Sequence, residues 1–295
     1  MSHSVIVGLA TLPSLVNGSG LDVLQAFLTQ PLPWLALLLA LSAAFLMGFA
    51  RSGLGTGGFV VSPLMVFALG PSDGLAVVAV LMLPAALLGV WQHRGEGERR
   101  LLQPLVLGMV LGTALGGLAL WALVSGGDLN IVHRRMEVLV ALLSLLYVAL
   151  VAGRNVIARA GGGGGPAGPT GLVLVGSGVG ISQTVANSGS PLLTVFFLRH
   201  QVPRSRFVAA QLIALLVQNL LKLIPLISLG ILHLGNAGSA LLLIPVTVIG
   251  NLSGQRFYRG ASERLFFLCY QVLLLIGFAV SVALIAGRSR ILALL

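Results

Sequence analysis

Residues 47–70 have the sequence MGFARSGLGTGGFVVSPLMVFALG, in which a glycine- and hydroxyl-rich break at 51–58 interrupts an apolar run. A second break, QTVANSGS at 183–190, follows 132 residues later. Polar, irregular backbone at membrane depth is tolerated only where protein buries it or where it lines a watery cavity. Two such breaks at matching places in two halves of a chain are typical of the binding site of a transporter.

The composition indicates an integral membrane protein. The 295 residues are 57% hydrophobic and only 8% charged. Soluble globular proteins carry about 25% charged residues, so this chain has too few to cover a water-facing surface. We expect it to lie in the lipid bilayer of the cell (plasma or inner) membrane. The net charge of +10 predicts no nucleic-acid partner, because the basic residues lie between the apolar runs and set orientation.

The apolar runs fall into two length classes. Crossing the hydrocarbon layer takes roughly 17–25 residues. Runs of about that length are 33–50, 73–91, 102–124, 136–153, 207–229 and 265–287, and 237–252 reaches it with its flanks. The shorter runs are 59–70, 171–181 and 190–198. We expect these to be half-helices that meet at the breaks, with 33–50 and 59–70 flanking the first and the other two flanking the second.

This order predicts an all-α polytopic membrane protein made of two inverted repeats, each a broken or re-entrant helix pair followed by three transmembrane helices. The expected segments are a leader 1–32, repeat 1 at 33–153, a glycine-rich linker 154–170, repeat 2 at 171–287 and a tail 288–295. Glycines support the repeat, since Gly48, Gly57, Gly112 and Gly116 of the first half correspond to Gly180, Gly189, Gly250 and Gly254 of the second.

The basic residues predict an orientation. Eleven fall on one side: Arg94, Arg99, Arg100, Arg154, Arg159, Arg199, Arg204, Arg206, Arg256, Arg259 and Arg264. Four fall on the other: Arg134, Arg135, Arg288 and Arg290. Cytoplasmic loops carry the excess of Lys and Arg. We therefore expect the linker 154–170 to be cytoplasmic and both termini to lie outside.

The stretch 47–70, with the later LVLGMVLGTALGG at 105–117, resembles the TauE/SafE sulfite-exporter family of anion permeases. Residues that fit its glycine cluster and following proline are Gly53, Gly55, Gly57, Gly58 and Pro63. The second half keeps Gly189 and Pro191, but Thr184, Asn187 and Ser188 stand where further glycines are usual. The resemblance implies a multi-pass permease for small anions, typically sulfite, sulfonates or other sulfur-containing or organic acids.

The breaks themselves predict an anion site. The helix after each break begins near Gly58 or Ser190, where the first amides lack partners and the helix dipole is positive. Glycines let a ligand approach those amides closely, so backbone alone can hold an anion. Side chains that could donate further hydrogen bonds are Ser52, Thr56, Gln183, Asn187 and Ser188. Alternatively, the glycines only allow tight turns and close contacts between helices, and they bind no ligand.

Two basic residues lie at membrane depth. Arg51 enters the first break, where its planar fork suits a sulfonate or carboxylate; alternatively it snorkels to the headgroups. Lys222 shares one predicted helix face with Gln211 and Asn219, so it either attracts the anion, gates its path or bonds to carbonyls of a neighbouring helix. The candidate binding residues are thus Arg51, Ser52, Gly55, Thr56, Gly57, Gly58, Gln183, Asn187, Ser188, Gly189, Asn219 and Lys222.

The sequence therefore predicts a transporter of a small anion that works by alternating access around a site at the bilayer midplane. We expect 51–58 to recognise charge and 183–190 to tune which anion is accepted. An anion channel of the same fold and a membrane scaffold are the alternatives. A serine-type membrane hydrolase is disfavoured, because no apolar run carries a serine paired with a histidine. No catalytic residue, metal or cofactor is expected, and the sequence leaves open whether the chain forms a homodimer.

Overall fold

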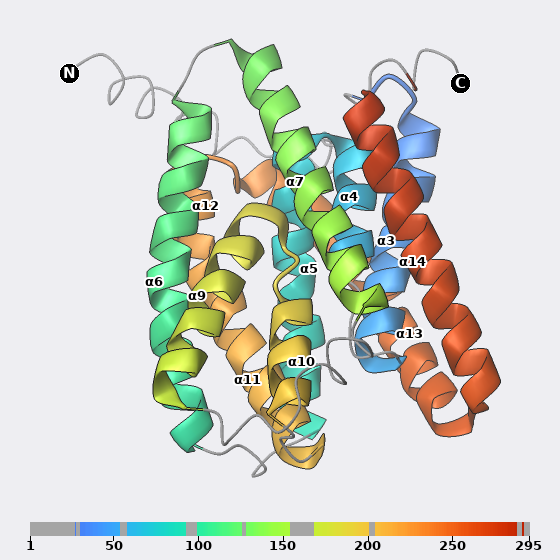
Figure 1. The fold of residues 1–295 in the computed structure, drawn as a ribbon. Coiled ribbons are helices and arrows are strands. Elements are labelled where there is room, and N and C mark those ends of the chain that lie inside the picture. The colour runs from blue at the N-terminus through green and yellow to red at the C-terminus, as the bar shows by residue number, and fades with distance from the viewer. Residues whose placement is uncertain are drawn as a thin grey trace.

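The computed structural model describes Phe27 and residues 30–53, 58–92, 99–125, 128–153, 168–200, 204–287 and Ile291. Within these ranges every regular element is helical and none is a strand, so the all-α prediction is confirmed (Figure 1). Most of the predicted leader, linker and tail lies outside the described residues. The same holds for the centre of the first break, 54–57.

The helices follow the predicted apolar runs. In chain order they are α3 (Pro33–Gly53), α4 (Gly58–Leu69), α5 (Pro71–Gln92), α6 (Arg99–Val124), α7 (Leu129–Ala152), α9 (Pro169–Ala186), α10 (Ser190–Arg199), α11 (Arg204–Leu221), α12 (Leu223–Ser228), α13 (Leu234–Gly260) and α14 (Glu263–Ala286). Five stretches of the described chain are long and apolar enough to cross a membrane: Pro33–Gly53, Pro71–Leu88, Arg100–Val124, Ala210–Ser228 and Leu234–Phe257.

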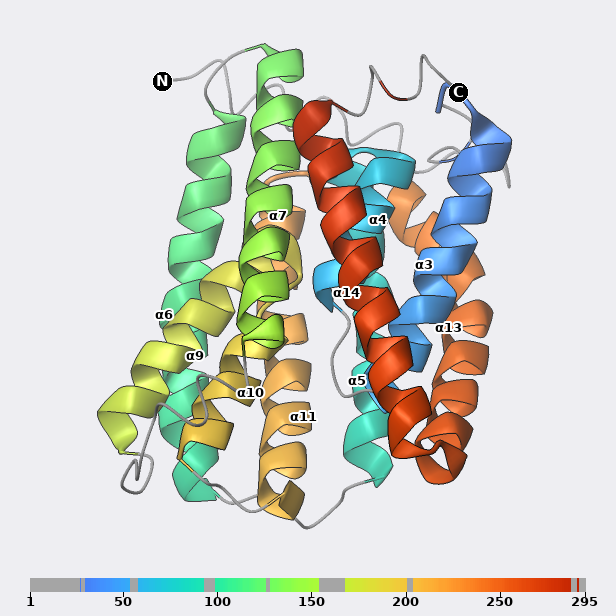
Figure 2. The same cartoon turned by 45° about the vertical axis from the view of Figure 1, so that its right-hand side comes forward.

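Two helix pairs reach into the bundle from opposite ends. Helix α3 descends from the upper end in Figures 1 and 2, and α4 returns to that end. Helix α9 rises from the lower end, turns inside the bundle, and α10 descends again (Figure 1). The second break, 187–189, lies in the interior of the protein.

Glycines set the closest helix crossings. A Cβ atom at Gly48 of α3 would overlap the Thr247 carbonyl oxygen of α13, and one at Gly180 of α9 would lie 2.6 Å from the Met109 carbonyl oxygen of α6. The opposing glycines behave likewise, since Gly250 faces the Phe45 carbonyl and Gly112 faces the Ser177 carbonyl. Small residues let helix backbones approach this closely. Gly48, Gly180, Gly112 and Gly250 therefore each lie where the backbone of a neighbouring helix comes close.

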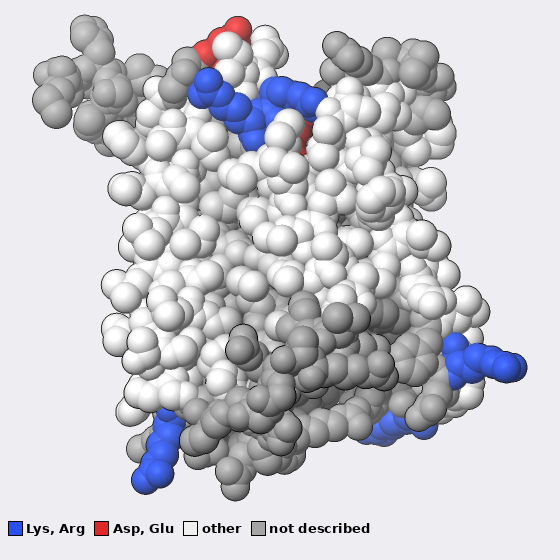
Figure 3. All heavy atoms as spheres, viewed as in Figure 1, with Lys and Arg blue, Asp and Glu red and all other residues white. Residues whose placement is uncertain are grey.

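The surface matches a lipid environment. On the face drawn in Figure 3, a broad band of uncharged side chains separates basic groups at the two ends. The three tryptophans, Trp34, Trp91 and Trp121, are 67%, 63% and 57% exposed and lie near ends of α3, α5 and α6. Tryptophan is enriched at membrane–water interfaces. Their positions near helix ends fit two interfacial belts around an apolar band.

Candidate functional site

Both breaks are narrower than the sequence suggested. Helix α3 continues to Gly53, so Arg51 and Ser52 form its last turn, and the Ser52 hydroxyl donates to the Gly48 carbonyl at 3.0 Å and to the Asn251 carbonyl at 2.6 Å. The next described residue is Gly58, where α4 begins. Gly55, Thr56 and Gly57 lie outside the described residues.

Helix α9 likewise runs to Ala186, five residues beyond the predicted end of its apolar run. Polar side chains there are compatible with helix because Ser182 and Thr184 donate to the carbonyls of Gly178 and Gly180, one turn back. Gln183 is therefore a helical residue, and the second break comprises only 187–189. Each hydroxyl satisfies its own hydrogen-bonding need inside the helix, which the polarity of the sequence alone did not reveal.

Asn187 is the centre of the second break. Its backbone is left-handed, with φ of 53°, and it caps the end of α9. Its side chain is buried and joins two other helices. The amide nitrogen donates to the Leu75 carbonyl of α5 at 3.0 Å, and Oδ1 accepts a hydrogen bond from Lys222. The neighbouring Ser188 hydroxyl donates to the Ala186 carbonyl at 2.9 Å.

Lys222 is fully buried at the junction of α11 and α12. The predicted single run 207–229 divides here because Pro225 lacks an amide hydrogen and its ring clashes with the carbonyl of Leu221, four residues earlier. The ammonium donates to Asn187 Oδ1 at 2.5 Å and to Met82 Sδ at 3.3 Å. Both partners are neutral.

Arg51, in the last turn of α3, lies within the range of electrostatic interaction with Lys222. Its side chain is partly exposed, but Nε and Nη2 are buried and have no hydrogen-bond partner among the described residues. No described carboxylate forms an ion pair with either cation; the described ion pairs join Arg134 to Glu137 and His233 to Asp73. Neither basic side chain therefore has an acidic partner among the described residues.

Two further polar side chains of α11, Gln218 and Asn219, are fully buried. Asn219 is fully buried; its amide nitrogen lies 3.4 Å from the Met82 carbonyl, and its Oδ1 has no described partner. Gln218 bonds to Thr113 of α6 and lies 3.4 Å from the Gly180 carbonyl. The predicted polar face of 207–229 is thus directed into the bundle.

The start of α4 meets the second break at this place. A Cβ atom added at Gly58, the first residue of α4, would lie 2.6 Å from the Asn187 carbonyl oxygen and 3.5 Å from the Met82 methyl group. Gly189 packs against the Gln183 side chain and the Val179 carbonyl. The structure thus brings Gly58, Asn187 and Lys222 together, although they are far apart in the sequence.

Two contributors were missed by the sequence. Met82 and the Leu75 carbonyl belong to α5, and neither a thioether in an apolar run nor a backbone oxygen carries a recognisable signal. The spacing of the sequence did relate one further pair of residues, Arg51 and Gln183. Arg51 and Gln183 are 132 residues apart, like the glycines of the two breaks, and Gln183 also has a buried polar atom, Oε1, without a described partner.

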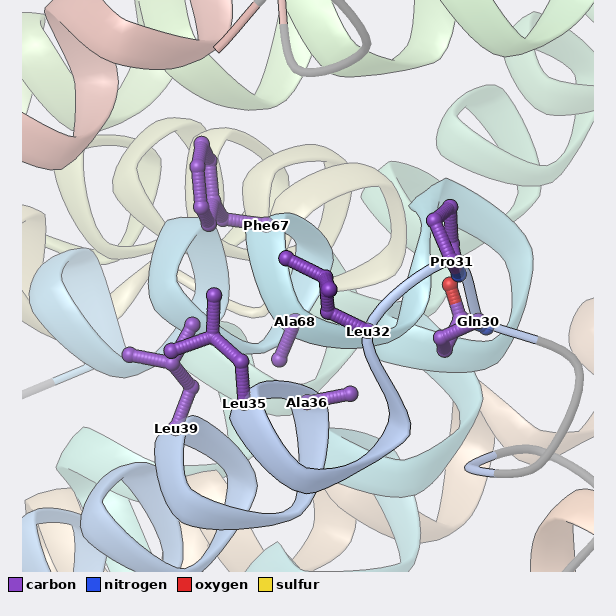
Figure 4. Close-up of a pocket in the computed structure, with 8 residues that line it drawn as sticks. All are labelled: Gln30, Pro31, Leu32, Leu35, Ala36, Leu39, Phe67 and Ala68. Carbon is purple, nitrogen blue, oxygen red and sulfur yellow. The ribbon is translucent and has the colours of Figure 1, made fainter. Parts of the chain in front are cut away.

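A small pocket lies elsewhere, between the start of α3 and the end of α4 (Figure 4). Its cavity volume of about 10 Å³ holds roughly one water molecule. The lining residues are Gln30, Pro31, Leu32, Leu35, Ala36, Leu39, Phe67 and Ala68. None of them is charged, so the pocket offers nothing to hold an anion. The described residues also contain no group of three or more His, Cys, Asp or Glu placed to hold a metal ion.

These features define the class of the molecule: an all-helical integral membrane protein with apolar spanning helices and a buried lysine in its interior. A comparison with protein-family models matches Sulfite exporter TauE/SafE over residues 39–282, most of the chain. The chain belongs to this family, and the resemblance inferred from 47–70 and 105–117 is confirmed. The family is one of membrane transporters. Searches of curated proteins and of solved structures gave no match.

Proposed function

We propose that this protein carries a small anion, such as sulfite, a sulfonate or a related sulfur-containing or organic acid, across the cell membrane. The observation that supports this most is the environment of Lys222. Its ammonium is fully buried, its hydrogen-bond partners are neutral, and a second cation, Arg51, lies nearby. An anion bound between these two residues would supply the negative charge that the described side chains around them lack.

Electrostatics explains why an anion would be favourable beside Arg51 and Lys222. A charged residue at membrane depth costs about 2.5–3.5 kcal/mol on insertion scales, and it usually pairs or marks a substrate path. Two like charges near each other add repulsion to that cost. An anion between Arg51 and Lys222 would offset both the cost of burying the charges and their mutual repulsion. The positive charges that destabilise the empty site would then stabilise the occupied one.

The helix arrangement supports alternating access as the mechanism. We propose that 33–153 and 171–287 are inverted repeats whose breaks share one substrate site. The opposite directions of the α3–α4 and α9–α10 pairs support this, as do the corresponding glycine contacts. Rocking of one repeat against the other would expose the site to each side in turn. In this proposal the linker 154–170 is cytoplasmic.

Reconstitution tests this function. Purified protein in liposomes is expected to give saturable sulfite flux and to accelerate exchange when unlabelled sulfite is present on the opposite side. Saturation with counterflow identifies a carrier, whereas flux that rises linearly and shows no counterflow identifies a channel. Empty liposomes give the background. No flux of any of sulfite, methanesulfonate, thiosulfate or acetate above that background would refute anion transport.

A further inference from the structure

The short turn between α13 and α14 carries three exposed arginines. Arg256 and Arg259 lie in the last two turns of α13, and Arg264 is the second residue of α14. The ion pairs among the described residues involve none of them. Three arginines against one glutamate, Glu263, give the segment 256–264 a formal charge of +2. The turn is therefore a basic surface whose arginines have no acidic partner among the described residues.

This surface lies at an end of the membrane-spanning bundle. The apolar stretch Leu234–Phe257 ends at the turn, so its arginines lie where hydrocarbon gives way to lipid headgroups. Figures 1 and 2 show the turn at the lower end of the bundle, and Figure 3 shows basic side chains at that end, below the uncharged band. In the proposed orientation this end faces the cytoplasmic leaflet.

Exposed apolar side chains continue from the arginines along both helices. On α13, Ile249 and Leu252 precede Arg256 by seven and four residues, so the three share one helix face. Their side chains are 57% and 49% exposed. On α14, Leu268 follows Arg264 by four residues and is 56% exposed. A phospholipid has the same order of groups, with a charged phosphate above apolar chains.

We propose that the α13–α14 turn binds an anionic phospholipid, such as phosphatidylglycerol. Its phosphate lies against Arg256 and Arg259, and its acyl chains lie along the apolar faces below. A guanidinium binds phosphate oxygens in pairs, which makes arginine well suited to this headgroup. A zwitterionic lipid such as phosphatidylcholine adds a positive choline group, which the net charge of the turn disfavours. The proposal does not depend on the transport of sulfite.

The position of the turn gives lipid binding a structural consequence. One turn before Arg256, a Cβ atom at Gly254 would overlap the Phe49 carbonyl of α3. The Ser52 hydroxyl of α3 donates to the Asn251 carbonyl of α13 at 2.6 Å. The end of α13 thus holds the last turn of α3. A ligand that binds only the folded protein raises its stability, so the lipid should raise the temperature of unfolding.

A competition between two lipids tests the proposal. Purified full-length protein in a neutral detergent is mixed with equal amounts of phosphatidylglycerol and phosphatidylcholine that have the same acyl chains. Native mass spectrometry then counts the lipids that remain bound. Wild type is expected to retain phosphatidylglycerol at least about tenfold more than phosphatidylcholine. Added phosphatidylglycerol should also raise the unfolding temperature more than phosphatidylcholine does.

Variants with matched charge locate the site. The double variant Arg256→Gln/Arg259→Gln should reduce the lipid preference at least about fivefold. Arg100→Gln/Arg135→Gln removes the same charge from exposed positions on α6 and α7 and should leave the preference within about twofold of wild type. Arg264→Gln changes the other helix of the turn and should reduce the preference about threefold, so it tests the site even if the double variant does not fold.

Each contrary result overturns the proposal. Equal retention of the two lipids by wild type would show that the turn has no preference for an anionic headgroup. An unchanged preference in the folded Arg256→Gln/Arg259→Gln variant, or an equal reduction in the control variant, would refute this location. Displacement of phosphatidylglycerol by an equal concentration of glycerol phosphate would identify a site for soluble phosphate instead of a lipid. The liposome flux of sulfite is measured separately, so the proposed function can fail or hold independently.

Discussion

Replacing Asn187 with aspartate puts a carboxylate in place of the neutral amide that holds Lys222. The Oδ1 atom of Asn187 lies 2.5 Å from the ammonium. At an effective dielectric constant of 20, opposite charges at that separation attract by about 7 kcal/mol before desolvation is subtracted. Burying the new carboxylate costs several kcal/mol, and losing the donor to the Leu75 carbonyl costs about 1–3 kcal/mol more. We therefore expect a variant of near-native stability.

Its effect on anion binding should be much larger. The carboxylate supplies the negative charge that we assign to the substrate, and it repels an anion placed against Lys222. We expect Asn187→Asp to weaken sulfite binding at least about 100-fold, which corresponds to about 2.7 kcal/mol. Calorimetry on the purified protein measures the affinity, and thermal unfolding measures the stability.

A matched control places the same charge elsewhere. Asn130→Asp adds a carboxylate at an exposed position at the start of α7 and should leave sulfite affinity within about twofold of wild type. Sulfite affinity equal to wild type in Asn187→Asp, in a variant that unfolds at the same temperature, would refute the reasoning about Lys222.

Three further predictions concern the packing of the helices and the orientation of the protein in the membrane. Gly48→Ala inserts a methyl group against the Thr247 carbonyl, so thermal unfolding should show a loss of about 1–3 kcal/mol, whereas Gly168→Ala, with open space around it, should show none. Arg134 donates to the carbonyls of the last turn of α14, so Arg134→Gln should lower stability by about 1–2 kcal/mol without changing sulfite affinity. A reporter fused after Leu295 should be active outside the cytoplasm; activity only inside would reverse the proposed orientation.

The lengths of the apolar runs were enough to predict most helices. Residues 102–124 and 73–91 lie within α6 and α5, because a run that spans the hydrocarbon layer has few other structures available. The glycine spacing also carried structural information. Gly48 and Gly180 each sit at a close helix crossing, where a side chain would prevent the backbones from approaching.

The limits of the breaks could not be predicted from polarity. Thr184 looks like part of a break, yet its hydroxyl bonds to the carbonyl one turn earlier and so remains compatible with helix. The structure divides the predicted run 207–229 into α11 and α12 at Lys222. Pro225 indicates such a division, but the apolar composition of the run favoured a single helix. Arg51, Asn187 and Lys222 were identifiable as unusual residues for this depth.

Their mutual contacts were not predictable in the same way. Lys222 and Asn187 are 35 residues apart in sequence, and Lys222 and Met82 are 140 apart. Such contacts depend on how the helices pack, and no local pattern encodes them. Met82 in particular has the sequence character of an ordinary core residue.

The central claim is that Arg51 and Lys222 together hold the transported anion. Equilibrium binding of radiolabelled sulfite to the purified protein tests it most directly. We predict one competable sulfite per chain for wild type and for Arg100→Gln, and a loss of binding in both Arg51→Gln and Lys222→Gln when these variants remain folded. Wild-type stoichiometry and affinity in either folded variant would contradict the claim.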